Sequence, residues 1–235
     1  MISIVIPCFN ERENIERFPE SLFPILKSLG EDFEVVIVDD GSGDGSQEIL
    51  KRFENSQEVK LVICRENRGL GEALKNGFAQ SAGEWILVLD ADLTFSPGQI
   101  PLLIENQRRY LSDMVSGSPW MGHETASQVL FWRRALSRLA NFSYRLALGI
   151  PLSSFTSIFR LYRSSCLKSL AIQSGGFEIN AEIAALFWIR GFKISETPAR
   201  LTKREYGKSK LNLFKELLSH LRLILRLIKL VRMNP

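Results

Sequence analysis

The chain has 235 residues, of which 45% are hydrophobic and 24% are charged, and its formal net charge is +4. This composition is ordinary for a globular protein and excludes a disordered or fibrous chain. The three cysteines, Cys8, Cys64 and Cys166, lie far apart and without CxxC spacing, so neither a disulfide framework nor a zinc site is predicted. No apolar run reaches the ~18 residues that a membrane-spanning helix needs. Because the chain starts directly in a predicted strand, we expect no signal peptide and a location in the cytoplasm.

The first half of the chain alternates predicted strands with predicted helices. Strands are predicted at residues 2–6, 33–38, 59–64, 85–89 and 114–116, and helices at 13–29, 46–53, 70–81 and from Pro97 onward. This alternation favours an α/β fold with a doubly wound, mostly parallel sheet. The second half is predicted to contain an amphipathic helix at 128–148, a strand-like segment at 157–162, and helices at 181–189 and 211–231.

Two carboxylates, Asp90 and Asp92, directly follow the apolar strand predicted at 85–89. Side chains at i and i+2 of an extended segment point to the same side, and open α/β sheets bind ligands beyond the carboxyl ends of their strands. Two close carboxylates repel each other unless a cation lies between them. Because hard oxygen ligands suit Mg²⁺ and Mn²⁺, the pair is predicted to bind one of these metals.

Polar loops also follow the first two strands, with the sequences PCFNE at 7–11 and VDDGSGDGS at 38–46. Neither a Walker loop nor a GxGxxG opens a helix, which excludes the P-loop and dinucleotide-binding classes. Three further motifs are NRGLG at 67–71, FRLYR at 159–163 and REYGKSKL at 204–211. In this order, the motifs resemble the family-two glycosyltransferases of GT-A fold. Within that family, they resemble the enzymes that make polyprenyl-phosphate sugars, of the dolichol-phosphate mannose synthase type.

The resemblance implies roles for the residues that match these motifs. The nucleotide site is expected to be lined by Pro7, Phe9, Glu11, Val38 and Asp40, with Asp39 beside them. The metal is expected on Asp90 and Asp92, and the donor diphosphate beside Asp90, Ala91, Asp92 and Thr94. Arg204 and Lys210 are expected to grip the phosphates, one as a bidentate fork and the other as a point charge. The catalytic residues that this implies are Asp92, Arg204 and Lys210.

The acceptor half departs from the family's pattern at three positions, one of which is Ile158, where a glycine is usual. Pro119 stands where an arginine is usual, and Ser154 stands where an aspartate is usual. The candidates for the missing cation are His123, Arg133 and Arg134. Arg133 and Arg134 match a basic site on the family's long helix, where the resemblance places the acceptor phosphate. The alternative for these two arginines is an ordinary solvated helix face.

The C-terminal segment 211–231 combines a cationic helix face with an apolar one. Lys215, Arg222, Arg226 and Lys229 lie within about 60° of one helix face, and leucines fill much of the rest. This pattern is typical of helices that lie on anionic membranes. The chain is therefore divided into a GT-A domain at 1–210 and a basic amphipathic helix at 211–235. The alternative is a helix that packs on the catalytic domain or on a second copy in a homo-oligomer.

Together, these patterns and the resemblance imply an inverting, metal-dependent transfer of a hexose to a polyprenyl or dolichyl phosphate at the cytoplasmic face of the membrane. The donor would be a nucleotide sugar of the GDP-mannose or UDP-glucose type, and no nucleic-acid partner is expected. A phosphate acceptor, with a second pKa of about 6, is already an anion at pH 7 and needs no general base. One rival is a transferase that acts on a glycan or glycolipid hydroxyl, with Glu178 or Glu182 as its base. The other is a non-catalytic module that binds nucleotide sugars.

Overall fold

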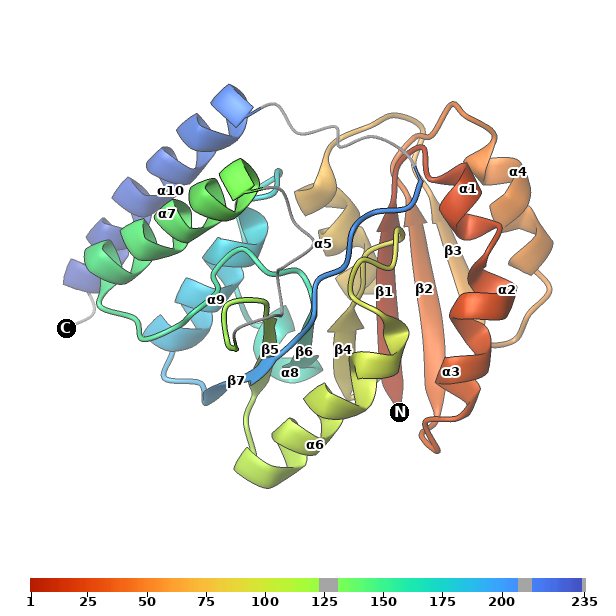
Figure 1. Cartoon of the computed structure of the whole chain (residues 1–235), viewed down its shortest axis with the longest axis horizontal. Helices are drawn as coiled ribbons and strands as arrows, with labels where there is room; N and C mark the ends of the chain where they lie inside the picture. The colour runs from red at the N-terminus through yellow and green to blue at the C-terminus, as the bar shows by residue number, and fades with distance from the viewer. Residues whose placement is uncertain (123–130, 207–212, 234–235) are drawn as a thin grey trace.

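The computed structural model describes residues 1–122, 131–206 and 213–233, with the backbone alone at 131–133, 213–215 and 232–233. Within these ranges, seven strands form one sheet in the order β3-β2-β1-β4-β6-β5-β7, with helices on both faces (Figure 1). The strands are β1 (Ile2–Cys8), β2 (Phe33–Asp39), β3 (Val59–Ile63), β4 (Trp85–Val88), β5 (Met114–Ser118), β6 (Arg160–Arg163) and β7 (Ile194–Pro198).

The sheet is mostly parallel, as the alternation of elements predicts. Strands β1 to β4 run parallel to one another, and β7 pairs in parallel with β5. The exception is β6, which is antiparallel to both β4 and β5. The predicted elements do not include β7, because its sequence ISETP is short and mostly polar and its side chains are mostly half-buried. Pairing with β5, and not a local pattern, makes this segment a strand.

The helices are α1 (Arg12–Ile15), α2 (Phe18–Ser21), α3 (Phe23–Lys27), α4 (Ser46–Leu50), α5 (Leu70–Gln80), α6 (Ile100–Tyr110), α7 (Phe131–Leu148), α8 (Ser164–Lys168), α9 (Ile179–Ile189) and α10 (Leu213–Met233), with 3₁₀ turns η1 (Lys51–Phe53) and η2 (Pro97–Gln99). The prediction of one helix at 13–29 is wrong, because that region folds as the three short helices α1 to α3. Pro19 and Pro24 explain the breaks: proline fits only the first turn of a helix, and each stands in the first turn of its own short helix.

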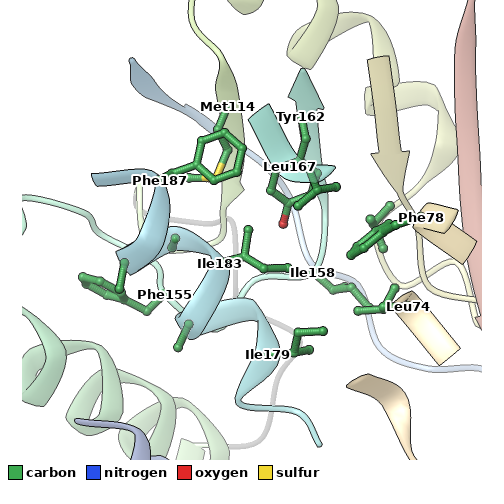
Figure 2. Close-up of a cluster of buried hydrophobic side chains, with 14 of the residues drawn as sticks. Leu74, Phe78, Met114, Phe155, Ile158, Tyr162, Leu167, Ile179, Ile183 and Phe187 are labelled. Carbon is green, nitrogen blue, oxygen red and sulfur yellow. The ribbon is translucent and has the colours of Figure 1, made fainter. Parts of the chain in front are cut away.

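Alternating side chains of the central strands enter two hydrophobic cores, one on each face of the sheet. Val5 and Val36 point toward the face covered by α5, α9, α7 and α10, whereas Ile4 and Ile37 point toward the face covered by α1 to α3 and α6. Figure 2 shows the first core, where side chains of α5 and β6 lie opposite those of α9. Because α9 is apolar on nearly every side, it is typical of a fully buried helix.

The C-terminal helix α10 lies beside α7 and also contacts α9 (Figure 1). Leu223 and Leu227 of α10 are buried in the first core, and the Nδ1 atom of His220 lies 2.7 Å from the hydroxyl of Tyr144 in α7. Burial lowers the pKa of His220, which favours the neutral imidazole in this contact. In the part of the chain that the structure describes, no helix has both the length and the apolarity to cross a membrane.

Arg160, the arginine of the FRLYR motif, is fully buried and joins β6 to three other segments. Its guanidinium donates to the hydroxyl of Ser116 (3.1 Å) and to the carbonyls of Asn180 (2.5 Å), Ser154 (3.0 Å) and Phe155 (2.8 Å). A lysine at this position has donors on a single nitrogen and cannot reach all of these acceptors. We therefore expect Arg160→Lys to lower the free energy of unfolding by about 2 kcal/mol, since buried carbonyls lose their donors.

Urea unfolding monitored by circular dichroism measures this loss. The matched control is Arg163→Lys on the same strand, because Arg163 is partly exposed and forms its ion pair with Asp113 at 2.8 Å near the surface. We expect the control to change stability by less than about 1 kcal/mol. An Arg160→Lys midpoint equal to that of the unchanged protein would show that these hydrogen bonds contribute nothing to stability.

Candidate functional site

Three loops leave the carboxyl ends of β1, β2 and β4 at one edge of the sheet, because these strands are adjacent and parallel. The register places Cys8 opposite Asp39, and the N–H of Asp40 donates to the carbonyl of Cys8 at 2.8 Å. Asp90 and Asp92 follow β4 at the same edge. The acidic residues of separate loops therefore lie together, in the position where open α/β sheets bind ligands.

The adjacent carboxylates of Asp39 and Asp40 differ in their hydrogen-bond partners. Both oxygens of Asp40 are occupied, because they accept the backbone N–H groups of Arg68 (3.0 Å) and Gly69 (2.8 Å). One oxygen of Asp39 accepts the N–H of Ser42 (3.1 Å) and the amide of Gln47 (2.8 Å). The other, Oδ1, is buried without a hydrogen-bond partner among the described residues. Since buried polar atoms normally have partners, Asp39 is better suited than Asp40 to accept an N–H from a ligand.

Asp90 and Asp92 occupy a tight turn after β4 that keeps their carboxylates close together. The N–H of Thr94 donates to Asp92 at 3.1 Å, and the Thr94 hydroxyl lies 3.5 Å from Asp90. Leu93, which follows Asp92 in this turn, has a φ of 52°, in the left-handed region. Burial and the neighbouring charge of Asp92 raise the pKa of Asp90 well above its usual range, and burial also raises the pKa of Asp92. A nearby cation would therefore stabilise the charged forms of Asp90 and Asp92.

Arg204 supplies positive charge to this carboxylate pair. Its guanidinium forms an ion pair with Glu11, and its Nε lies 3.3 Å from Oδ2 of Asp92. The three side chains are only 24%, 11% and 15% exposed, respectively. Burial alone would lower the pKa of Arg204, but the hydrogen bond to Glu11 and the charge of Asp92 raise it. Arg204, Glu11 and Asp92 therefore form one charged cluster, although 193 positions separate Arg204 from Glu11 along the chain.

The segment after β7 runs across the sheet to this edge (Figure 1), where its Arg204 lies beside Asp92. Both the N–H and the hydroxyl of Thr202 donate to the carbonyl of Thr94 at 2.9 Å. Gln99 binds the backbone of Arg200 twice, accepting its N–H at 2.6 Å and donating to its carbonyl at 2.9 Å. The segment is thus fastened to the loop that follows Asp92, and this fastening places Arg204 beside Asp92.

The residues at this edge fit a divalent cation that a substrate helps to hold. Asp90 and Asp92 offer hard carboxylate oxygens, and burial raises the pKa of both, so a cation beside them would stabilise their charged forms. In the described residues, no group of three or more His, Cys, Asp or Glu side chains is arranged to hold a metal alone. Mg²⁺ commonly takes one or two carboxylates and completes its coordination with substrate phosphates. Two carboxylates therefore suffice when a diphosphate is bound.

The other residues expected at the donor site are distributed between the edge and the cores. Pro7, Phe9 and Glu11 are partly buried at the edge. Val38 is fully buried in the first core, and Ala91, which is 4% exposed, belongs to the second. The side chains of Val38 and Ala91 therefore pack in the hydrophobic cores and stabilise the strand ends that carry the site.

Part of the predicted phosphate and acceptor site lies outside the described residues. Lys210 and His123 lie outside the described residues, as does the side chain of Arg133. Arg134 lies in the first turn of α7 and is partly buried. A cleft of about 220 Å³ opens beside Asp92, and Arg17 and Lys203 contribute to its lining.

The two candidate general bases, Glu178 and Glu182, differ in their burial and in their hydrogen-bond partners. Glu182 is 2% exposed, and its carboxylate accepts the N–H groups of Gln173 and Ser174 as well as the guanidinium of Arg226. Glu178 keeps one buried oxygen, Oε2, without a hydrogen-bond partner in the part of the chain that is described. Glu182 is therefore a structural anchor, and the hydroxyl-acceptor alternative loses one of its two candidate bases.

Comparison with known proteins identifies relatives along most of the chain. The model for "Glycosyl transferase family 2" matches residues 3–171. A dolichol-phosphate mannosyltransferase from Pyrococcus furiosus is 32% identical over 236 residues, which cover 97% of this chain and 64% of that protein. An undecaprenyl-phosphate 4-deoxy-4-formamido-L-arabinose transferase from Edwardsiella ictaluri is 31% identical over 217 residues, which cover 91% and 64%. The chain thus spans slightly less than two thirds of the length of these relatives.

A solved structure supports the fold. The glucosyl-3-phosphoglycerate synthase of Mycobacterium tuberculosis, crystallised with Mn²⁺, UDP and glucosyl-3-phosphoglycerate, superposes with a TM-score of 0.69. The match covers 100% of this chain and 81% of that one at 20% identity. The predicted GT-A architecture is confirmed by this superposition and by the mostly parallel sheet.

Proposed function

Since this chain belongs to glycosyl transferase family 2, we propose that it transfers a hexose from a nucleotide sugar to a polyprenyl phosphate with inversion of configuration. The donor is of the GDP-mannose or UDP-glucose type, and the metal is Mg²⁺ or Mn²⁺. The observation that carries the proposal is the cluster of Asp90, Asp92 and Arg204 at the ligand-binding edge of the sheet. The names of the two curated relatives, which are transferases of dolichol phosphate and undecaprenyl phosphate, support the acceptor class.

The site has the groups that departure of a nucleotide diphosphate requires. A cation held by Asp90 and Asp92 would neutralise the charge that develops on the leaving diphosphate. Arg204 would contribute two parallel N–H donors to the same phosphates, and Asp39 would accept an N–H of the base through its free oxygen. A phosphate acceptor requires no proton removal, because its second pKa is about 6. This agrees with a site in which Glu182 already serves as a structural anchor.

A donor panel tests the proposed function directly. Purified protein is incubated with GDP-mannose, UDP-glucose and related nucleotide sugars, with Mn²⁺ or Mg²⁺, and with either a polyprenyl phosphate or a free glycan as acceptor. We expect glycolipid formation from one donor, only with the lipid phosphate. Transfer to the glycan instead would favour the hydroxyl-acceptor rival, and donor binding without any transfer would favour a non-catalytic binding module.

We also propose that the outer faces of α7 and α10 attach the protein to a membrane surface, on its cytoplasmic side. Both helices leave a stripe of large apolar side chains exposed on the side opposite their buried residues. These are Leu136, Leu139, Phe142 and Leu146 of α7, and Leu217, Leu218, Leu221 and Leu225 of α10, with exposed fractions between 37% and 76%. Exposed apolar patches of this kind are typical of membrane or protein contacts.

Among the described side chains of α10, fewer cations are exposed than the sequence predicts. Arg222 and Lys229 are exposed, as predicted, but Arg226 turns inward and pairs with Glu182 at 2.6 Å. The side chain of Lys215 lies outside the described residues. Attachment would therefore depend more on the leucines than on the cations, and it should persist in part at high salt, where charge interactions are screened.

The substitutions Leu139→Gln, Leu221→Gln and Leu225→Gln, combined in one variant, are expected to abolish co-sedimentation with anionic liposomes. Each residue is more than half exposed, so stability should change by about 0.5 kcal/mol or less per site. Deleting α10 would be a poorer test, because Leu223 and Leu227 belong to the core.

The matched control is Leu111→Gln, because Leu111 is 69% exposed at the end of α6. We expect this variant to bind liposomes like the unchanged protein. Unchanged liposome binding by the triple variant would remove the membrane proposal. If the triple variant instead converts a dimer into a monomer, the two stripes form a contact between copies.

A further inference from the structure

Arg226 of the C-terminal helix joins a loop of the catalytic half to a buried carboxylate. Its Nη2 lies 2.6 Å from Glu182 of α9, and its Nη1 lies 2.6 Å from the side-chain oxygen of Gln173. Glu182 in turn accepts the N–H groups of Gln173 (3.1 Å) and Ser174 (2.7 Å). One guanidinium from α10 therefore holds both α9 and the loop at 173–176.

The loop at 173–176 is pressed against the first turn of α5. The carbonyl of Gly175 accepts the N–H of Gly71 at 2.9 Å. A Cβ added to Gly71 would lie 2.5 Å from the carbonyl carbon of Gly175 and 2.7 Å from the carbonyl oxygen of Ser174. A Cβ added to Gly69 would lie 2.8 Å from the carbonyl oxygen of Gly175. The two backbones are in such close contact that any movement of the loop would also displace the first turn of α5.

The turn that the loop supports belongs to the donor-binding edge. The N–H groups of Arg68 and Gly69 hold both oxygens of Asp40. The next residue, Gly41, is packed so tightly against this turn that an added Cβ would lie 2.5 Å from the carbonyl carbon of Glu66. A continuous series of contacts thus runs from α10, through the loop at 173–176 and the start of α5, to Asp40.

From this series we propose that Arg226 is a positioning residue for the donor site, through which the C-terminal helix orders the turn at 66–71. The proposal rests on the proposed function, because it requires that this edge bind the nucleotide diphosphate. It goes beyond that function by giving α10 a role in donor affinity as well as in membrane attachment. Loss of Arg226 should weaken donor binding and leave turnover at saturating donor nearly unchanged, because Arg226 contacts neither Asp92 nor Arg204.

Three variants test successive links of the series. Arg226→Ala removes the guanidinium, and Gln173→Ala removes one contact of the exposed Gln173 while leaving the pair between Arg226 and Glu182 intact. Gly71→Ala pushes the loop away from α5, although alanine would ordinarily stabilise a helix relative to glycine. The control is Arg190→Ala, which removes an exposed arginine at the end of α9, the helix that also carries Glu182.

Calorimetry with GDP and with UDP, each in the presence of Mn²⁺, and hydrogen exchange at the amides of 68–71 are the two measurements. We expect about tenfold weaker binding in Arg226→Ala and Gly71→Ala, a typical size for coupling between sites. Gln173→Ala should weaken binding less. Amide exchange should be faster in all three variants, and the KM for the donor should rise without a matching fall in kcat. Arg226→Lys should restore part of the affinity, because it keeps a cation beside Glu182.

The outcomes separate this inference from the function on which it rests. If the unchanged protein binds neither nucleotide diphosphate, the proposed function fails, and the positioning role fails with it. If the unchanged protein binds one of them and all three variants bind it equally well, with unchanged exchange at 68–71, only the positioning role is overturned. Should Arg226→Ala fail to fold, Gln173→Ala and Gly71→Ala still decide between these outcomes, because neither of them removes a buried charge.

Discussion

The Asp92→Asn variant is expected to transfer sugar about a thousandfold more slowly than the unchanged protein, a loss of about 4 kcal/mol of transition-state stabilisation. Asparagine removes one of the two charges that would hold a cation against the leaving diphosphate. It retains an oxygen that can accept the N–H of Thr94, which Asp92 binds at 3.1 Å. The turn after β4 should therefore keep its shape, so that the effect reports on charge and not on folding.

Initial rates with Mn²⁺, and calorimetry of the nucleotide diphosphate with and without Mn²⁺, measure this effect. The matched control is Asp44→Asn, because Asp44 also accepts a backbone N–H at this edge, from Ser46 at 3.0 Å. We expect the control to remain active within a few-fold, and EDTA to abolish activity in the unchanged protein. Full activity in EDTA, or in Asp92→Asn, would remove the metal assignment.

Arg204→Gln is expected to lower kcat/KM for the donor about a hundredfold, which is about 2.7 kcal/mol, and to make the donor-free protein less stable. The charged cluster loses its guanidinium in this variant, and the carboxylates of Glu11, Asp90 and Asp92 remain close together. We expect the free energy of unfolding at pH 7 to fall by about 2 kcal/mol, less than for a fully buried pair because these side chains are partly exposed.

Thermal unfolding with and without Mn²⁺ tests the expected loss of stability in Arg204→Gln. If Arg204 acts as the internal counter-charge of the carboxylates, Mn²⁺ should raise the melting temperature more in Arg204→Gln than in the unchanged protein. The control is Arg200→Gln, because Arg200 is exposed in the same segment and is held to Gln99 by its backbone. Equal Mn²⁺ shifts in Arg204→Gln and the unchanged protein would contradict this role.

Much of the fold follows from local patterns. Apolar runs at 2–6, 33–38 and 85–89 predict β1, β2 and β4, because a buried parallel strand needs apolar side chains on both faces. The prediction of one helix at 13–29 failed because apolar spacing takes no account of Pro19 and Pro24, each of which stands in the first turn of a new short helix. β7 was missed because its polar sequence becomes a strand only beside β5.

The donor-binding edge was predictable because its residues follow strand ends. Parallel strands bring their carboxyl ends together whatever the rest of the chain does, so Asp39, Asp90 and Asp92 could be placed in one region from the sequence. The preference for Asp39 over Asp40 as the free acceptor could not be foreseen. It depends on the turn at 67–69, whose N–H groups occupy both oxygens of Asp40.

By itself, the sequence determined the α/β class, the acidic edge and the family, because spacing along a strand or helix is a local property. The tertiary structure decided which partners these residues take. Arg204 meets Glu11 and Asp92 only because the segment after β7 is fastened to the loop beside Asp92. A helical pattern likewise shows that α10 has two faces, but burial against α7 and α9 decides which one turns inward. That choice buries Leu227 and joins Arg226 to Glu182, because a buried carboxylate needs a nearby cation, and it leaves Leu221 and Leu225 exposed.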